Sequence, residues 1–193
     1  MNTKALMKPN VTIRQVSEND GLYKSIEKNL MLQCNESADT LRNLFFGEET
    51  QVSSPKLWVI SSVEQVVGYV ITFDFYQATY ITTLYINEEF RREGFGSMLL
   101  EHISDNPNRT YVLLTQVAMS DSDMLSVCVR RKIFYLKNGF RTVPIKWRYE
   151  RYYRWDVHVK GPDLELGSLL AVLRKGEEIW RTAYVFHREK NVI

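Results

Sequence analysis

Arginine and glycine residues stand close together in one short segment that could bind phosphate. Residues 91–97 read RREGFGS and lie between an apolar stretch, residues 79–86, and a stretch with helical spacing. The first N–H groups of a helix carry partial positive charge and accept anions, and glycines let an anion approach the backbone closely. These residues therefore predict a site for a phosphate or diphosphate group. A Gly-x-Gly between a strand and a helix is, however, often only a tight turn.

Two common nucleotide-binding motifs are excluded at this segment. The P-loop requires Gly-Lys-Ser or Gly-Lys-Thr, which is absent. The dinucleotide-binding motif requires a third small residue where Leu99 stands, and no acidic residue follows at the expected distance. A diphosphate bound here must therefore belong to another class of ligand.

Metal and disulfide chemistry is not indicated. His158 and His187 lie in separate strand-like segments without the spacing of metal ligands, and His102 is expected to pack in its helix. Cys34 and Cys128 form no CxxC pattern, so we expect reduced thiols and no metal. Reduced thiols are typical of a cytoplasmic protein, and the N-terminal residues show no secretory signal.

The composition is that of an ordinary soluble domain. The chain has 193 residues, of which 45% are hydrophobic and 25% are charged, with a formal net charge of +2. This charge is too small to indicate a nucleic acid or a membrane as a partner, and no apolar run is long enough to span a bilayer.

The elements that must position the chemistry alternate between strands and helices. Runs rich in β-branched and aromatic residues predict strands at residues 11–16, 56–63, 65–76, 79–86, 110–117, 140–147 and 153–160. Helical spacing predicts helices from residue 22 to about 31, and at 38–46, 96–103 and 123–137. The expected fold class is therefore mixed α/β (α+β).

Two motifs in this order resemble the GNAT superfamily of acyl-CoA N-acyltransferases. The first is LYINEEFRREGFGSMLLEHI, which contains the family's Arg-x-x-Gly-x-Gly turn after an apolar strand, and the second is FYLKNGF, which ends in Gly139–Phe140. The resemblance covers about residues 11–160 and implies a mixed, mainly antiparallel central sheet flanked by helices. We therefore expect an acyltransferase domain at residues 1–160 and a C-terminal extension at residues 161–193.

The resemblance also implies a cofactor, acetyl-CoA, and a role for each matched residue. The backbone of the strand end pairs with the pantetheine arm, an exposed amide near Tyr85 faces the oxyanion, and the loop amides wrap the pyrophosphate. The implied cofactor-binding residues are Leu84, Tyr85, Ile86, Arg91, Arg92, Glu93, Gly94, Phe95, Gly96 and Ser97.

One catalytic residue, Tyr135, matches the family's tyrosine. A tyrosine is protonated at neutral pH and can give a proton to a departing thiolate. A purely structural role at the end of a helix stays open. The family's glutamates have no counterpart, because Thr82 and Gln116 stand in their places. A base could act through water, come from Asp74 or come from the substrate, and no base is assigned.

The segment 146–160, KWRYERYYRWDVHVK, interleaves aromatic and basic residues. Such a pattern suits single-stranded RNA, but a strand pair with one aromatic face explains it more simply. The predicted function is transfer of an acetyl group from acetyl-CoA to a primary amine of a small molecule or protein by direct attack. The alternatives are an acyl-CoA-binding module without turnover and an acyltransferase directed to RNA or a tRNA-linked amine.

The C-terminal extension is too apolar to be a disordered tail. Residues 168–174 and 178–186 flank Lys175-Gly176-Glu177, which predicts a β-hairpin, although periodicity leaves a helix through residues 164–175 open. An isolated hairpin is only marginally stable. The extension is therefore expected to pack on its own domain or on a second copy in a homodimer, and to narrow the acceptor pocket.

Overall fold

The computed structural model describes residues 10–34, 37–47, 55–63, 65–117, 122–149 and 153–188. Its elements are, in chain order, β1 (Val11–Gln15), α1 (Gly21–Cys34), α2 (Ala38–Phe46), β2 (Lys56–Ser62), β3 (Gln65–Phe75), β4 (Ala78–Ile86), the short 3-10 helix η1 (Glu88–Phe90), α3 (Phe95–Ile103), β5 (Thr110–Gln116), α4 (Ser122–Lys137), β6 (Arg141–Tyr149), β7 (Tyr153–Lys160) and α5 (Leu166–Arg188). The seven strands predicted between residues 11 and 160 are all present.

The strands form one seven-stranded mixed sheet in the order β1-β2-β3-β4-β5-β7-β6. Only β4 and β5 run parallel, and the other described neighbours pair antiparallel. The prediction of a mixed, mainly antiparallel sheet flanked by helices is confirmed.

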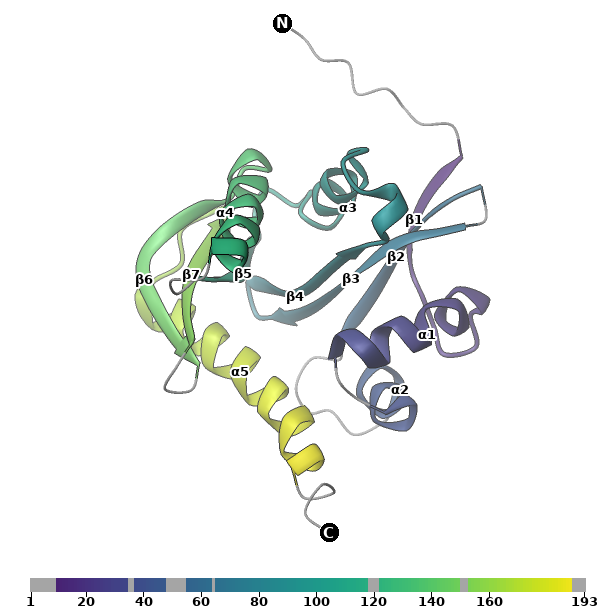
Figure 1. The fold of residues 1–193 in the computed structure, drawn as a ribbon. Coiled ribbons are helices and arrows are strands. Elements are labelled where there is room, and N and C mark those ends of the chain that lie inside the picture. Colours follow the sequence, from purple (N-terminus) through teal and green to yellow (C-terminus); the bar gives the residue numbers. More distant parts are fainter. Residues whose placement is uncertain are drawn as a thin grey trace, which may run out of the picture.

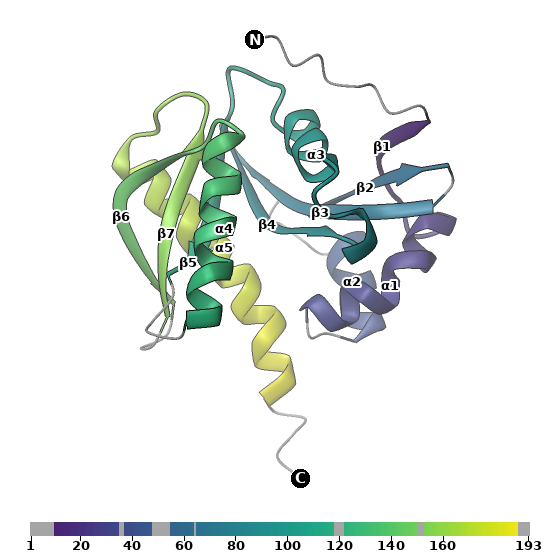
Figure 2. The ribbon, with the colours of Figure 1, turned by 45° about the horizontal axis from the view of Figure 1, so that its top comes forward.

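The parallel pair comes apart in the middle of the sheet. β4 pairs with β5 only over residues 78–81, opposite residues 110–113. Beyond this point β4 stays paired with β3 while β5 stays paired with β7, so the two strands diverge (Figure 2). Within the described residues, the edge of β4 at residues 82–86 therefore has no strand beside it. Alternate backbone groups along this edge can pair with an extended ligand.

Helices cover both faces of the sheet. α3 and α4 lie on one face, and α1, α2 and α5 lie on the other (Figure 1). Side chains along β3 point alternately to the two faces of the sheet. Tyr69, Ile71 and Phe73 belong to the buried cluster on the α1 side, and Val70 belongs to the cluster on the α3 side. The sheet thus lies between two helical layers.

The predicted C-terminal β-hairpin is wrong, because this segment forms the helix α5. Over residues 166–178 of α5, whose burial the structure describes, the buried residues are Leu169, Val172, Leu173 and Gly176, which recur at intervals of three, four and seven residues and make one helical stripe. The stripe packs on the sheet of the same chain, in the cluster on the α1 side.

Gly176 was predicted to lie in a turn, but in the structure it lies where α5 contacts the sheet closely. A Cβ added to Gly176 would lie 2.5 Å from Cε1 and 2.8 Å from Cδ1 of Tyr80 on β4. Only glycine lets α5 approach the Tyr80 ring this closely. The glycine that suggested a hairpin turn is therefore explained by the tight packing of α5 on the sheet.

The aromatic and basic residues of 146–160 largely form a strand pair. Trp147 lies opposite Trp155 in the β6–β7 ladder, and Arg148 lies opposite Arg154. Both arginines are exposed, while the tryptophans are partly buried. This arrangement supports the structural interpretation of the segment; residues 150–152 lie outside the described ones.

Neither a membrane-spanning helix nor a cluster of metal ligands is found among the described residues. No described helix has the length and hydropathy needed to cross a bilayer. No three His, Cys, Asp or Glu residues among them lie together as a metal site would require.

Candidate active site

The loop between η1 and α3 contains a left-handed glycine, as expected for a tight turn. Arg92 has a φ of 69° and Gly94 a φ of 90°, so two residues of the turn are left-handed. Gly94 is the N-cap of α3, and a Cβ placed there would meet no atom within 4 Å. Glycine has no side chain that could cap the helix, and open space lies where its Cβ would be. The N-terminus of α3 therefore fits an external anion such as a phosphate.

The second glycine of the loop has a packing role. A Cβ on Gly96 would lie 3.2 Å from Cζ of Phe134 on α4 and 3.6 Å from Cγ1 of Ile86. The absence of a side chain lets α3 lie close to both α4 and the end of β4. Phe95, between the glycines, is buried and meets Phe90 edge-on, so its side chain anchors the helix in the core.

The two arginines of the loop differ in what they contact. Arg91 donates from Nε to the Ile86 carbonyl at 3.0 Å and ion-pairs with Glu88 at 3.1 Å. Its guanidinium carbon also lies 6.0 Å from the centre of the Tyr85 ring. Arg91 thus holds the loop against the end of β4. Arg92 is exposed and makes no hydrogen bond or ion pair with another described residue, which leaves its charge for a ligand.

The strand end predicted to pair with pantetheine lies along the gap. Leu84, Tyr85 and Ile86 pair with β3 on one side only. Leu84 and Ile86 pack toward the α3 layer, and Tyr85 packs toward the α1 layer. The opposite backbone edge of these residues faces the space between β4 and β5.

Tyr135 lies near the end of α4, on the α3 side of the sheet. Its ring contacts Phe134, Phe140 and His158, with ring centres 5.2, 5.9 and 6.4 Å away. Burial raises the pKa of Tyr135 to about 12, and the charge of Arg131 opposes this rise. The hydroxyl is therefore protonated at neutral pH and belongs to the same buried layer as Leu84 and Ile86.

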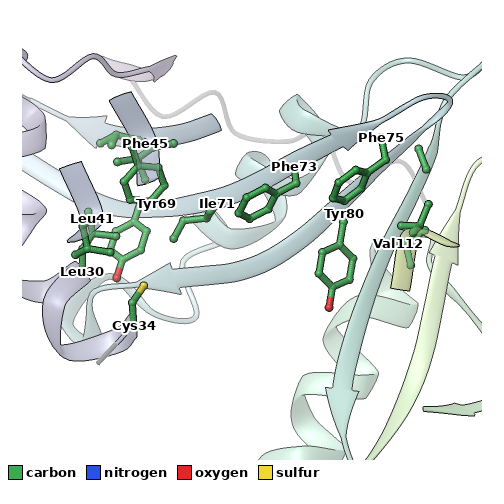
Figure 3. Close-up of a cluster of buried hydrophobic side chains, with 14 of the residues drawn as sticks. Leu30, Cys34, Leu41, Phe45, Tyr69, Ile71, Phe73, Phe75, Tyr80 and Val112 are labelled. Atoms are coloured by element: carbon green, nitrogen blue, oxygen red, sulfur yellow. The ribbon is translucent and has the colours of Figure 1, made fainter. Parts of the chain in front are cut away.

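A cavity of about 280 Å³ opens on the other side of the sheet, where β4 and β5 part. Its walls come from α1, β4, β5, β6, β7 and α5. The lining residues are Gln33, Cys34, Tyr80, Ile81, Thr82, Thr83, Leu114, Trp147, Trp155, Leu173 and Glu177. Figure 3 shows two of them, Tyr80 and Cys34, in the buried cluster of this side. The gap between β4 and β5 thus lies between Tyr135 in one layer and a cavity in the other.

The model of one protein family matches this region. The family is described as acetyltransferase (GNAT) domain, and the match covers residues 53–142, which include β2, β3, β4, the glycine loop, α3, β5 and α4. The chain contains a GNAT acetyltransferase domain. The resemblance noted from the two sequence motifs is confirmed.

Solved structures of GNAT proteins have the same fold. An acetyltransferase of Bacteroides thetaiotaomicron superposes with a TM-score of 0.64 at 16% identity, over 86% of this chain and 94% of that one. A GNAT acetyltransferase of Elizabethkingia anophelis with acetyl-CoA bound gives 0.55 at 16%, over 80% and 100%. The aminoglycoside 6'-N-acetyltransferase of Enterococcus faecium gives 0.57 at 15%, over 80% and 99%.

GNAT domains move the acyl group of an acyl-CoA to an amine. The predictions of an acetyl-CoA-dependent N-acetyltransferase, and of acetyl-CoA as its cofactor, are therefore confirmed at the level of the family. The individual site residues stay predictions. The glycine loop follows the free edge of β4 in the chain, and Tyr135 belongs to the same buried layer as Leu84 and Ile86 of that edge.

The GNAT domain has no base at the two positions where relatives carry glutamate. Thr82 lines the cavity and donates its hydroxyl to the Ile71 carbonyl at 3.2 Å. Gln116 lies at the end of β5, opposite Trp155. Neither side chain takes up a proton at neutral pH.

Asp74, the carboxylate considered from the sequence, is held in an ion cluster on β3. It pairs with Lys56 at 2.6 Å and Arg109 at 2.9 Å, and it accepts the Thr79 hydroxyl at 2.6 Å. Burial would raise the pKa of Asp74, but the hydrogen bonds and charges of these partners outweigh burial and lower it. A carboxylate bound in this way is a poor proton acceptor.

Sequence analysis missed a polar cluster beside Tyr135. His158 is fully buried, with Nε2 2.7 Å from the Thr115 hydroxyl and Nδ1 3.2 Å from the Thr142 hydroxyl. Burial lowers the pKa of His158, so the ring is neutral at pH 7. Asp156, two residues earlier on β7, ion-pairs with Lys132 and Lys146. The sequence WDVHVK did contain a signal for this cluster, because polar residues that recur every second position point to the same face of a strand.

Proposed function

We propose that this protein transfers the acetyl group of acetyl-CoA to a primary amine held in the cavity between α1, α5 and the diverging strands. The observation that carries the proposal is the β4–β5 gap. Near this gap lie the N-terminus of α3, which could accept an anion, a protonated tyrosine in one layer and a cavity in the other layer.

The residues of the loop and of the strand end bind the donor. The N-terminus of α3 and the free charge of Arg92 hold the pyrophosphate. The open edge of residues 82–86 pairs with the amides of the pantetheine arm. Acetyl-CoA supplies an activated thioester when bound. The chain's own contribution is to place that thioester in the gap, beside backbone N–H groups near Tyr85.

Tyr135 donates the proton that the departing sulfur needs. Its raised pKa keeps the hydroxyl protonated at neutral pH, and its aromatic neighbours hold the ring in one orientation. His158, neutral and bound to two threonine hydroxyls, supports the ring from β7 without carrying a charge toward it.

The cavity favours a compact acceptor. A volume of about 280 Å³ lies at the lower end of ligand pockets, which hold roughly 300–1,000 Å³. Trp147, Trp155 and Leu114 make much of its wall apolar, and Glu177 is the one acidic side chain among its described lining residues. A polycationic aminoglycoside needs several carboxylates. We therefore propose an amine on a small apolar body, either free or at the end of a peptide.

The direct test is acetyl-CoA turnover against a panel of amines. The panel contains 2-phenylethylamine, spermidine, kanamycin and a short peptide with a free N-terminus, and the N-acetyl product is identified by mass spectrometry. The proposal predicts amine-dependent release of free CoA, greatest for 2-phenylethylamine. Release of CoA that is independent of every amine would contradict it.

A second candidate is an acyl-CoA-binding protein without turnover. The absence of a base at Thr82 and Gln116 favours it. Under this alternative, acetyl-CoA raises the melting temperature but no amine in the panel is acetylated.

A further inference from the structure

We propose that Glu177, contributed by α5, is the carboxylate that binds the acceptor's ammonium group and takes its proton. This inference rests on the proposed function. It places the missing base outside residues 53–142, the segment that the family model matches. It also gives α5 a catalytic purpose in addition to covering the sheet.

Glu177 lies at the wall of the cavity. It shares this wall with Tyr80, Thr82 and Thr83 of β4, next to the point where β4 leaves β5. Burial is the main cause of the raised pKa of Tyr80, and the negative charge of Glu177 adds to it. The carboxylate is therefore electrostatically close to β4 inside the cavity.

The packing of α5 fixes this position. Glu177 follows Gly176, whose missing side chain lets the helix backbone lie against the Tyr80 ring. On the preceding turn, Leu173 is buried and lines the same cavity. Helix α5 cannot shift along the sheet without losing both contacts, so the carboxylate is held at a set distance from β4.

No other described lining residue carries a carboxylate. The remaining polar groups of the wall are amides, hydroxyls, a thiol and indole rings, and the Tyr80 hydroxyl is kept protonated by its raised pKa. A carboxylate has about four acceptor positions, so Glu177 can bind an ammonium group in addition to its contacts within the chain.

The two tryptophans of the cavity wall suit the organic part of an amine. The indole N–H of Trp155 is shielded from solvent and has no hydrogen-bond partner among the described residues, so a ligand in the cavity would meet the ring and not this N–H. Trp147 and Trp155 pair across β6 and β7, and both line the cavity. Their rings can receive the apolar body of an amine, or a cation over their faces.

The proton transfers balance with Glu177 in this role. The carboxylate removes one proton from the ammonium group and passes it to solvent. The neutral nitrogen then forms a bond to the thioester carbon, and the bond between that carbon and sulfur breaks with its electron pair on sulfur. Tyr135 gives its proton to sulfur and regains one from the nitrogen through water. The products are an N-acetyl amine, free CoA and one proton released.

The test compares Glu177→Gln with Glu178→Gln. Glu178 is the next residue on α5, and its carboxylate ion-pairs with Lys175 on the outside of the helix. For 2-phenylethylamine, kcat/KM should fall by roughly a hundred-fold or more in Glu177→Gln and stay within about two-fold of wild type in Glu178→Gln. Thermal unfolding of both variants shows whether the fold is kept.

Binding provides a readout that is independent of turnover. With CoA bound, quenching of tryptophan fluorescence should report 2-phenylethylamine binding to wild type, and Glu177→Gln should bind this amine no better than the uncharged 2-phenylethanol. Glu177→Asp keeps the charge and should recover part of the amine preference. Equal kcat/KM in Glu177→Gln and wild type would overturn the inference while leaving the proposed function intact. A wild-type protein that acetylates no amine would overturn both.

Discussion

At the scale of single residues, the site combines groups whose charge states are set by burial. Tyr135 is kept protonated and His158 is kept neutral, each mainly by removal from solvent. Asp156 stays ionised beside two lysines, because their hydrogen bonds outweigh its burial. Under the proposed function, Tyr135 can therefore give a proton to the leaving sulfur at neutral pH.

Tyr135→Phe tests the donor. Removal of the hydroxyl should lower kcat by roughly ten- to a thousand-fold, because the proton is needed mainly in the transition state. The Kd for CoA should stay nearly unchanged, since the ring and its packing remain. Steady-state kinetics and calorimetry measure the two quantities. A variant with wild-type kcat would show that Tyr135 only packs.

His158 predicts how stability depends on pH. Its pKa is lowered in the folded state, so the unfolded chain binds the proton more readily. The contribution of His158 is therefore fully present above its unfolded pKa of about 6.5 and is lost as the pH falls below it. The charged groups that influence the pKa of His158 are Asp156, which raises it, and Lys132 and Lys146, which lower it.

Urea unfolding at about pH 7.5 and about pH 5.5 measures this loss. Wild type should lose stability between the two values, and His158→Asn should lose much less. His102→Asn is the control, because His102 is exposed and should leave the pH dependence as in wild type. An identical pH dependence in His158→Asn would refute the assignment.

At the scale of elements, the proposed function depends on the loop before α3 and on the helix α5. The loop could be predicted because its Arg-x-x-Gly-x-Gly residues are consecutive and each glycine acts locally. The strands could be predicted from their β-branched runs. α5 could not, because Gly176 resembles a turn residue, and only the Tyr80 ring on a distant strand shows why a glycine stands there.

Gly94→Asp tests the loop. The wild type should gain roughly 2–3 kcal/mol of stability at a hundred times the Kd of acetyl-CoA, because ligand binds only the folded state. A carboxylate at the helix N-terminus would compete with phosphate and abolish this gain. Thermal shift with and without acetyl-CoA measures it, and Gly94→Ala separates charge from backbone strain. A full shift in Gly94→Asp would place the pyrophosphate elsewhere.

Gly176→Ala tests the contact between α5 and the sheet. The new methyl group would lie within 3 Å of the Tyr80 ring, which should destabilise the protein by about 1–3 kcal/mol. Gly167→Ala is the matched control on the same helix, because no atom lies within 4 Å of its Cβ position. It should be neutral or stabilising by up to about 1 kcal/mol. Chemical denaturation distinguishes the two; equal stabilities would mean that α5 does not pack tightly on Tyr80.

At the scale of the whole molecule, the proposal places the donor on one side of the diverging sheet and the acceptor on the other. The cavity could not be predicted from the sequence, because its walls come from residues between Gln33 and Glu177 on strands and helices that only the fold brings together. The same is true of His158, whose neighbours Thr115 and Thr142 lie on other strands. Local motifs identify the donor side, and three-dimensional contacts identify the acceptor side.

A crystal structure with CoA bound tests the central claim most directly. The account predicts pyrophosphate at the N-terminus of α3, pantetheine along residues 82–86 of β4, and the sulfur in the gap within hydrogen-bonding distance of the Tyr135 hydroxyl. The cavity lined by Glu177 should open onto the sulfur from the other layer. Pyrophosphate away from Gly94, or a sulfur out of reach of both Tyr135 and the cavity, would contradict the account.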